Sequence, residues 1–209
     1  MISTVHYISQ GADGEMHLGN IKRMLGAGAN WIQLRLKDVP KAEVLATAIA
    51  AKKLCKNAGA TLIVNDFPEV AKKADADGVH LGKSDMSPAE ARKILGKNKI
   101  IGGTANTIED CERLLEQQVD YMGVGPFRFT TTKKNLSPIL GIEGYQQLMA
   151  QVLANPKAVP VIAIGGLLLD DMLGLKECGV HGVAISGMLT NSEKPEEEIS
   201  RIMELFGSL

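Results

Sequence analysis

Residues 28–37 read GANWIQLRLK, with a glycine-alanine pair, a short apolar run and an exit that alternates polar and apolar residues. Residues 59–66 (GATLIVND) repeat this order, and residues 179–182 (GVHG) again lead from the end of an expected helix into a strand. Glycine is common just past a helix end, and short β-branched runs are typical of strands. The repetition indicates a chain built from one helix–turn–strand unit used several times.

Short strands are expected at eight places, namely residues 5–9, 31–34, 61–64, 78–80, 100–102, 121–124, 161–164 and 182–185. The segments between them carry apolar residues at helical spacing, as at positions 44, 45, 48, 51 and 54. Strands that alternate with helices form a parallel sheet, and eight such units can close into a (β/α)8 (TIM) barrel. We therefore predict the α/β class and one barrel domain over residues 1–209.

A doubly wound open sheet is the competing architecture. It usually has fewer strands and a dominant glycine loop after the first one. Residues 10–14 (QGADG) follow the first expected strand here, and they do not form a dinucleotide-binding fingerprint. The closed barrel is therefore favoured.

The composition argues against several kinds of partner. The formal net charge of −1 favours neither nucleic acid nor an acidic membrane surface. The longest apolar runs are too short to span a bilayer, and residues 1–6 do not resemble a signal peptide. Cys55, Cys111 and Cys178 are scattered, so we expect reduced thiols and neither a disulfide nor a zinc site. These features predict a cytoplasmic protein and leave a homo-oligomer open.

Polar residues gather in the segments that leave the expected strands, whereas the segments that enter them are short and plain. The polar exits are residues 33–37 (QLRLK), 65–66 (ND), 83–85 (KSD), 104–106 (TAN), 125–135 (GPFRFTTTKKN), 165–166 (GG) and 186–187 (SG). In a (β/α)8 barrel, the loops after the strands build the active site. The asymmetry predicts an enzyme, with its site at this face.

Gln33, Arg35 and Lys37 lie two residues apart, so an extended chain projects them to one side. An inward-facing arginine is costly unless it meets an anion or water. We interpret the three residues as an anion clamp at the barrel mouth. A solvated strand end with a surface salt bridge is the plainer alternative.

Asp66 and Asp85 follow the third and fourth expected strands. Two carboxylates on adjacent strand ends can share Mg²⁺, which takes one or two protein carboxylates together with phosphate oxygens and water. The alternatives are an Asx-type turn at Asp66, before Pro68, and a helix cap at Asp85. Beside Arg35 and Lys37, the pair favours the metal.

Phosphate groups suit the remaining exits. Residues 125–135 are long for a connector and carry hydroxyls and lysines. Gly165, Gly166 and Ser186 follow the seventh and eighth strands, where barrels often bind phosphate through backbone N–H groups. His80 is interpreted as a packed, hydrogen-bonded strand-end residue, and Trp31 as part of the core or the barrel bottom.

Taken together, these segments resemble the thiamine phosphate synthase (thiamine phosphate pyrophosphorylase) family, which also includes a thiazole tautomerase branch. The matching segments lie in the family's order and spacing from about residue 30 to residue 190, and they are residues 33–37, 62–66, 76–85, 119–127, 130–133 and 161–166. The first thirty residues match only loosely.

The resemblance implies the transfer of a pyrimidinylmethyl group. Hydroxymethylpyrimidine pyrophosphate joins the thiazole phosphate, giving thiamine phosphate and pyrophosphate. By the same resemblance, Asp66 and Asp85 hold Mg²⁺, Gln33 contacts the pyrimidine, and the pyrophosphate is contacted by Arg35, Lys37, Asn65, Thr104 and Lys133. The thiazole phosphate is held by Thr130, Thr132, Gly166, Ile185 and Ser186. Because no protein nucleophile is required, catalysis falls to the charges that neutralise the leaving group, which are Arg35, Lys37, Lys133 and the metal.

The chain departs from the family pattern at Phe67, Thr104 and Asn106, and residues 182–186 are one residue shorter than usual. Two alternatives follow. A thiazole tautomerase places a histidine where this chain has Gly125-Pro126. A non-catalytic binder of phosphorylated ligands is permitted by the shorter eighth strand.

Overall fold

The structure is a computed structural model that describes residues 2–129 and 138–207, in which strands and helices alternate. The strands are β1 (Val5–Ile8), β2 (Trp31–Leu34), β3 (Thr61–Asn65), β4 (Gly78–Leu81), β5 (Ile100–Ala105), β6 (Tyr121–Val124), β7 (Val161–Ile164) and β8 (Gly182–Ile185). The α-helices are α1 (Gly14–Gly26), α2 (Lys41–Asn57), α3 (Pro68–Lys73), α4 (Pro88–Leu95), α5 (Ile108–Glu116), α6 (Gly141–Ala154), α7 (Met172–Glu177), α8 (Gly187–Thr190) and α9 (Pro195–Gly207), and a 3-10 turn, η1 (Leu169–Asp171), precedes α7.

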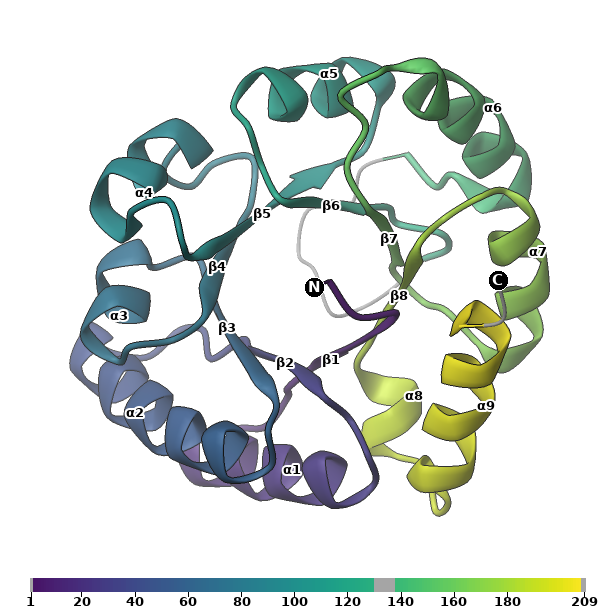
Figure 1. The fold of residues 1–209 in the computed structure, drawn as a ribbon. Helices are drawn as coiled ribbons and strands as arrows, with labels where there is room; N and C mark the ends of the chain where they lie inside the picture. The colour runs from purple at the N-terminus through teal and green to yellow at the C-terminus, as the bar shows by residue number, and fades with distance from the viewer. Residues whose placement is uncertain (1, 130–137, 208–209) are drawn as a thin grey trace.

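The strands form one closed parallel barrel in sequence order, and β8 pairs with β1 to complete it. Figure 1 shows the helices as a ring around the barrel. The predicted (β/α)8 fold is confirmed. The predicted ranges of β2, β6, β7 and β8 coincide with the observed ones, and the others differ by one to three residues at their carboxyl ends.

The strand β5 differs most from its prediction, because residues 102–105 (GGTA) have a weak strand signature. A glycine is required at position 102 by close packing, since a Cβ atom there would lie 2.1 Å from Cζ of Tyr121. The aromatic ring of a neighbouring strand thus takes the place of a side chain on β5.

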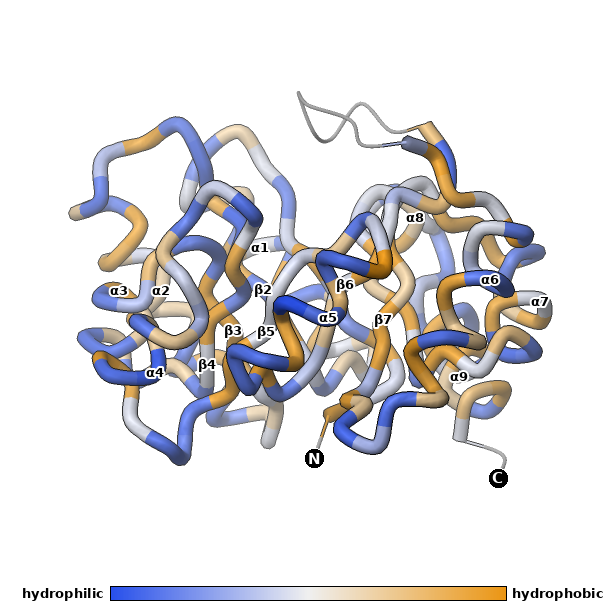
Figure 2. The backbone as a smooth tube through the Cα atoms, turned by 90° about the horizontal axis from the view of Figure 1, so that it is seen from above, coloured by the Kyte–Doolittle hydropathy of each residue, from blue (hydrophilic) through white to orange (hydrophobic). Residues whose placement is uncertain are grey.

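Two hydrophobic cores follow from the alternation of side chains along the strands. Ile32, Leu34, Leu62 and Val64 belong to the larger core with the helices. Trp31 and its neighbours belong to a second, smaller cluster, completed by Ile8, Ile63, Tyr121, Ile162 and Ala184. In Figure 2, hydrophilic and hydrophobic segments alternate along the outer helices, as expected for helices with one buried face.

The small cluster contains a chain of buried polar side chains. Trp31 is 1% exposed, and its ring stacks on His6 with the centroids 3.7 Å apart. His80 binds the hydroxyl of Tyr121 through Nδ1 at 2.9 Å and the hydroxyl of Thr104 through Nε2 at 3.0 Å. The interpretations of Trp31 as core and of His80 as a packed histidine are confirmed.

Side chains cap the starts of α4 and α5. Ser87 caps α4 in a reciprocal capping box with Glu90, and Thr107 accepts from the N–H of Asp110 at the start of α5. On α7, Met172 and Leu175 are buried, whereas Leu173 is 57% exposed. In the part of the chain that the structure describes, no helix is long and apolar enough to cross a membrane.

Candidate active site

The carboxyl ends of β2 and β3 bring the first predicted side chains together. Gln33 and Asn65 are both buried, and the side-chain amide of Gln33 donates to Oδ1 of Asn65 at 2.8 Å. Arg35 follows β2, half-buried, and its backbone N–H donates to Oγ of Ser9 at 3.2 Å. Oγ of Ser9 is in turn 2.6 Å from Nδ1 of the buried His17. The backbone carrying the predicted clamp is therefore held by two residues that the sequence did not single out.

A compact group of opposite charges lies beside Arg35. Nζ of Lys37 is 2.8 Å from Oδ2 of Asp66. Burial raises the pKa of Asp85, and the carboxyl group of Asp66, within hydrogen-bonding reach, raises it further. Burial lowers the pKa of Arg35, while the charges of Asp66 and Asp38 oppose that shift. The structure thus assembles Arg35, Lys37, Asp66 and Asp85 from the ends of three adjacent strands.

Asp85 does not act as a helix cap. The cap of α4 is Ser87, so the cap interpretation of Asp85 was wrong. Oδ2 of Asp85 instead accepts from the N–H of Gly82 at 2.7 Å. Asp66 has a φ of +67°, a left-handed conformation that aspartate tolerates better than most residues and that clusters at functional sites. Two carboxylates held this close repel each other unless a proton or a cation lies between them.

Thr104 lies near the carboxyl end of β5, and its hydroxyl contacts His80 inside the barrel. Because Tyr121 binds the other nitrogen of His80, the imidazole is fixed from both sides. Thr104 is 8% exposed. Its single hydroxyl would have to make both the predicted ligand contact and the contact with His80. A hydroxyl can donate one hydrogen bond while accepting others, which permits both contacts.

A second group lies at the ends of β7 and β8. Gly165 and Gly166 have φ angles of +100° and +68°, which favour glycine. The hydroxyl of Ser186 donates to Oε1 of Gln10 at 3.2 Å. Ile185 is 3% exposed, and its side chain belongs to the larger core with the helices. Only the backbone of Ile185 is therefore available to a ligand at the mouth.

The charged group lies at the ends of β2–β4 and the second group at the ends of β7 and β8, so the barrel end presents two polar regions. The predicted residues Thr130, Thr132 and Lys133 lie outside the described residues. Within the described ranges, no group of three or more His, Cys, Asp or Glu side chains could hold a metal ion.

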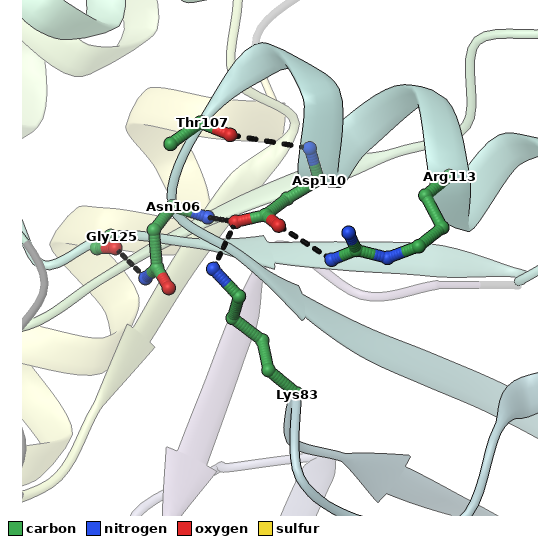
Figure 3. Close-up of polar contacts among 6 residues, drawn as sticks. All are labelled: Lys83, Asn106, Thr107, Asp110, Arg113 and Gly125. Atoms are coloured by element: carbon green, nitrogen blue, oxygen red, sulfur yellow. Dashed lines mark hydrogen bonds and ion pairs between the residues drawn. The ribbon is translucent and has the colours of Figure 1, made fainter.

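Asp110 ties together the loops that leave β4, β5 and β6, and sequence patterns did not reveal it. Its buried carboxylate accepts from Nζ of Lys83 at 2.6 Å, from the N–H of Asn106 at 3.0 Å and from Arg113 at 2.5 Å (Figure 3). The side-chain amide of Asn106 donates to the carbonyl of Gly125. The network links the loop that carries Asp85 to the loop that follows Thr104.

Burial would raise the pKa of Asp110, but the hydrogen bonds from Lys83, Asn106 and Arg113 hold it below its ordinary value of 3.8. Replacing Asp110 with alanine is expected to lower the free energy of unfolding by about 2 kcal/mol at pH 7, since Lys83 and Arg113 can return to water. A lowered pKa stabilises the folded state above pH 3.8, and this contribution disappears as the pH falls through the folded-state value.

Urea unfolding of the wild type and of Asp110→Ala at about pH 7 and about pH 3.5 measures this difference. The difference in the free energy of unfolding between the two proteins should be smaller at the lower pH. Glu112→Ala, an exposed carboxylate on the same helix, is the control and should change stability little. A gap that widens on acidification would contradict the assignment.

The protein is a (β/α)8 barrel whose two polar regions lie at the carboxyl ends of the strands. The sequence profile of the family described as thiamine monophosphate synthase matches residues 5–189. The chain belongs to this family.

Two curated relatives match along nearly their whole length. The chain is 47% identical to the thiamine-phosphate synthase of Phocaeicola vulgatus over 96% of this chain and 97% of that protein. It is 46% identical to the thiamine-phosphate synthase of Bacteroides fragilis, over 97% of this chain and 99% of that protein. Among solved structures, the thiamine phosphate pyrophosphorylase from Pyrococcus furiosus has a TM-score of 0.81 and 27% identity, covering 96% of this chain and 95% of that chain.

Proposed function

We propose that the chain is a thiamine phosphate synthase. It transfers the pyrimidinylmethyl group of hydroxymethylpyrimidine pyrophosphate to the nitrogen of the thiazole phosphate and releases pyrophosphate. The observation that carries the proposal is the cluster of Arg35, Lys37, Asp66 and Asp85, present in a chain that matches thiamine-phosphate synthases over its length. The small phosphorylated substrates and a cytoplasmic location are part of the same proposal.

The reaction makes modest chemical demands on the protein. The bond between the pyrimidinylmethyl carbon and the pyrophosphate oxygen breaks, and the electron pair leaves with pyrophosphate. The aminopyrimidine ring stabilises the resulting cation, and the thiazole nitrogen then forms the new bond. The protein must therefore neutralise the leaving group and hold the two reactants in line.

The residues of the first region suit the pyrophosphate and the pyrimidine. Arg35 and Lys37 supply positive charge where the leaving group gains negative charge. Since the amide of Gln33 already donates to Asn65, its side-chain oxygen can accept from the amino group of the pyrimidine. Lys133 would add charge from the loop after β6, which the sequence alone suggests.

The carboxylates of Asp66 and Asp85 fit Mg²⁺. They lie within hydrogen-bonding reach of each other, and Mg²⁺ characteristically takes one or two protein carboxylates with phosphate oxygens and water. When bound, the ion would supply additional positive charge for the pyrophosphate oxygens. Lys37 contacts Asp66. We expect its ammonium group to pair with a phosphate oxygen when the substrate binds.

The second region suits the thiazole phosphate. Phosphate-binding barrels commonly use the loops after strands seven and eight, where backbone N–H groups donate to phosphate oxygens. Gly165, Gly166 and Ser186 occupy these loops, and Ile185 contributes only its backbone. The predicted shortening of residues 182–186 does not remove β8, which has four residues and pairs with both β1 and β7.

A steady-state assay with both substrates tests the proposal. We expect thiamine phosphate and pyrophosphate to form in equal amounts, only when both substrates and Mg²⁺ are present. A thiazole tautomerase would instead isomerise a thiazole carboxylate phosphate without any pyrimidine substrate. That result, with no thiamine phosphate, would contradict the proposal.

Replacing Ser186 with alanine should have a modest effect. The change removes one hydroxyl, which is expected to cost about 1–2 kcal/mol of binding to the thiazole phosphate. Titration calorimetry with the thiazole phosphate measures the loss. A loss of all binding would show that the hydroxyl of Ser186, rather than backbone N–H groups, holds the phosphate.

A further inference from the structure

Phe127 and Arg128, which follow β6, are hydrogen-bonded to the Gly165-Gly166 turn after β7 and to the residue before it. The N–H of Phe127 donates to the carbonyl of Ile164 at 2.9 Å, and the N–H of Arg128 donates to the carbonyl of Gly165 at 3.0 Å. Nη1 of Arg128 donates to the carbonyl of Gly166 at 2.6 Å. Arg128 therefore holds both carbonyl groups of the diglycine.

The guanidinium of Arg128 is itself fixed by Asp171. Nη1 and Nη2 of Arg128 lie 2.6 Å and 2.8 Å from the two carboxylate oxygens of Asp171, a bidentate arrangement. The same carboxylate accepts from the N–H of Leu168 at 2.7 Å. The carboxylate of Asp171 is only 11% exposed. The turn is thus tied at its glycines by Arg128 and just beyond them by Asp171.

These contacts determine which way the free N–H groups of the turn point. In a trans peptide, the carbonyl of one residue and the N–H of the next point in opposite directions. Because Arg128 binds the carbonyls of Gly165 and Gly166, the N–H groups of Gly166 and Leu167 point away from Arg128. Among the described residues, neither N–H group donates a hydrogen bond.

The packing allows little freedom in this arrangement. A Cβ atom on Gly166 would lie 2.5 Å from Cγ of Arg128 and 3.0 Å from the carbonyl oxygen of Phe129. The stem of Arg128 therefore lies directly over Gly166. The guanidinium also lies over the ring of Phe127, 4.9 Å from its centroid, which further restricts the side chain.

We propose that Arg128, held by Asp171, is a positioning residue that fixes the Gly165-Gly166 turn so that its N–H groups bind the phosphate of the thiazole substrate. The inference rests on the proposed function and goes beyond it. Arg128 acts through the turn: its guanidinium makes two contacts with Asp171 and one with the carbonyl of Gly166, and the backbone N–H groups of the turn are left to bind the phosphate.

Steady-state kinetics of Arg128→Ala and Asp171→Asn test the proposal with each substrate varied in turn. Arg128→Ala should raise the KM for the thiazole phosphate about tenfold or more, while kcat and the KM for the pyrimidine pyrophosphate change less than about threefold. Asp171→Asn should act in the same direction with a smaller effect. Because the two residues form one unit, the double variant should be no worse than Arg128→Ala.

Arg92→Ala is the matched control, since Arg92 pairs with Asp120 at 2.7 Å near the amino end of β6. It should change the thermal unfolding temperature and leave both KM values unchanged. Arg128→Lys keeps one charged donor, so it should recover part of the affinity and serves if the alanine variant does not fold. A phosphate bound directly by Arg128 would leave Asp171→Asn with a normal KM.

Three results would overturn the inference: a normal KM for the thiazole phosphate in Arg128→Ala, a normal KM in Asp171→Asn, or an equal rise in Arg92→Ala. If the wild type forms thiamine phosphate and Arg128→Ala keeps its KM, only this inference fails. If the wild type forms none, the proposed function fails first.

Discussion

Replacing either Asp66 or Asp85 with asparagine is expected to lower kcat/KM about 100-fold or more, because each change removes one carboxylate from the proposed Mg²⁺ site. Asparagine keeps the shape of the side chain and tolerates the left-handed backbone at Asp66, whose φ is +67°. The fold should therefore survive, and the loss should be partly relieved by raising the Mg²⁺ concentration. Pyrophosphate release measured across a magnesium titration gives the result.

Asp75→Asn is the control for this pair. Asp75 is also an aspartate in the left-handed region, with a φ of +49°, but it pairs with Lys99 on the surface. An exposed ion pair contributes little to stability, so this variant should keep full activity. Wild-type activity of Asp66→Asn or Asp85→Asn at limiting Mg²⁺ would remove the carboxylates from the metal assignment.

Replacing Gly166 with valine is expected to raise the KM for the thiazole phosphate by a factor of about 100 or more. The backbone at Gly166 has a φ of +68°, which a β-branched residue rarely adopts, and the new Cβ would collide with the stem of Arg128. The turn must move to relieve the unfavourable φ and the collision with Arg128. This movement redirects the N–H groups of the turn. The KM for the pyrimidine pyrophosphate should change much less.

Gly28→Val separates backbone strain from loss of the turn. Gly28 has a φ of +95°, a Cβ atom there would meet no other atom within 4 Å, and the residue lies before β2, at the opposite end of the barrel. This variant should lose stability without a change in either KM. Equal effects on the KM for the thiazole phosphate in both variants would show that the Gly165-Gly166 turn has no special part in binding.

The sequence predicted the barrel because each strand carries a local signal. The run Val161–Ile164 lies between Pro160 and Gly165, and Trp31–Leu34 lies between Asn30 and Arg35, so the limits of both strands were predicted correctly. The strand β5 was predicted too short, since its glycines weaken the strand pattern, and Gly102 makes room for Tyr121 on the neighbouring strand. A contact between strands leaves no local pattern in the sequence.

In the candidate site, too, some features could be predicted from the sequence and others could not. Arg35, Lys37 and Asp66 follow strand ends directly, so their approach to one another could be predicted from strand order alone. Asp110 and Asp171 act from the start of helical segments on partners 27 and 43 residues away, Lys83 and Arg128. Neither pairing has a spacing that sequence analysis could recognise. The side-chain direction of Ile185 was equally hidden, because it depends on the phase of β8 in the closed barrel.

The most direct test of the central claim is a crystal structure of the protein with thiamine phosphate, pyrophosphate and Mg²⁺. We expect pyrophosphate against Arg35 and Lys37, the metal between Asp66 and Asp85, and the product phosphate on the N–H groups of the Gly165-Gly166 turn beside Ser186. Pyrophosphate bound away from the ends of β2–β4, or a product phosphate that does not contact this turn, would contradict the claim.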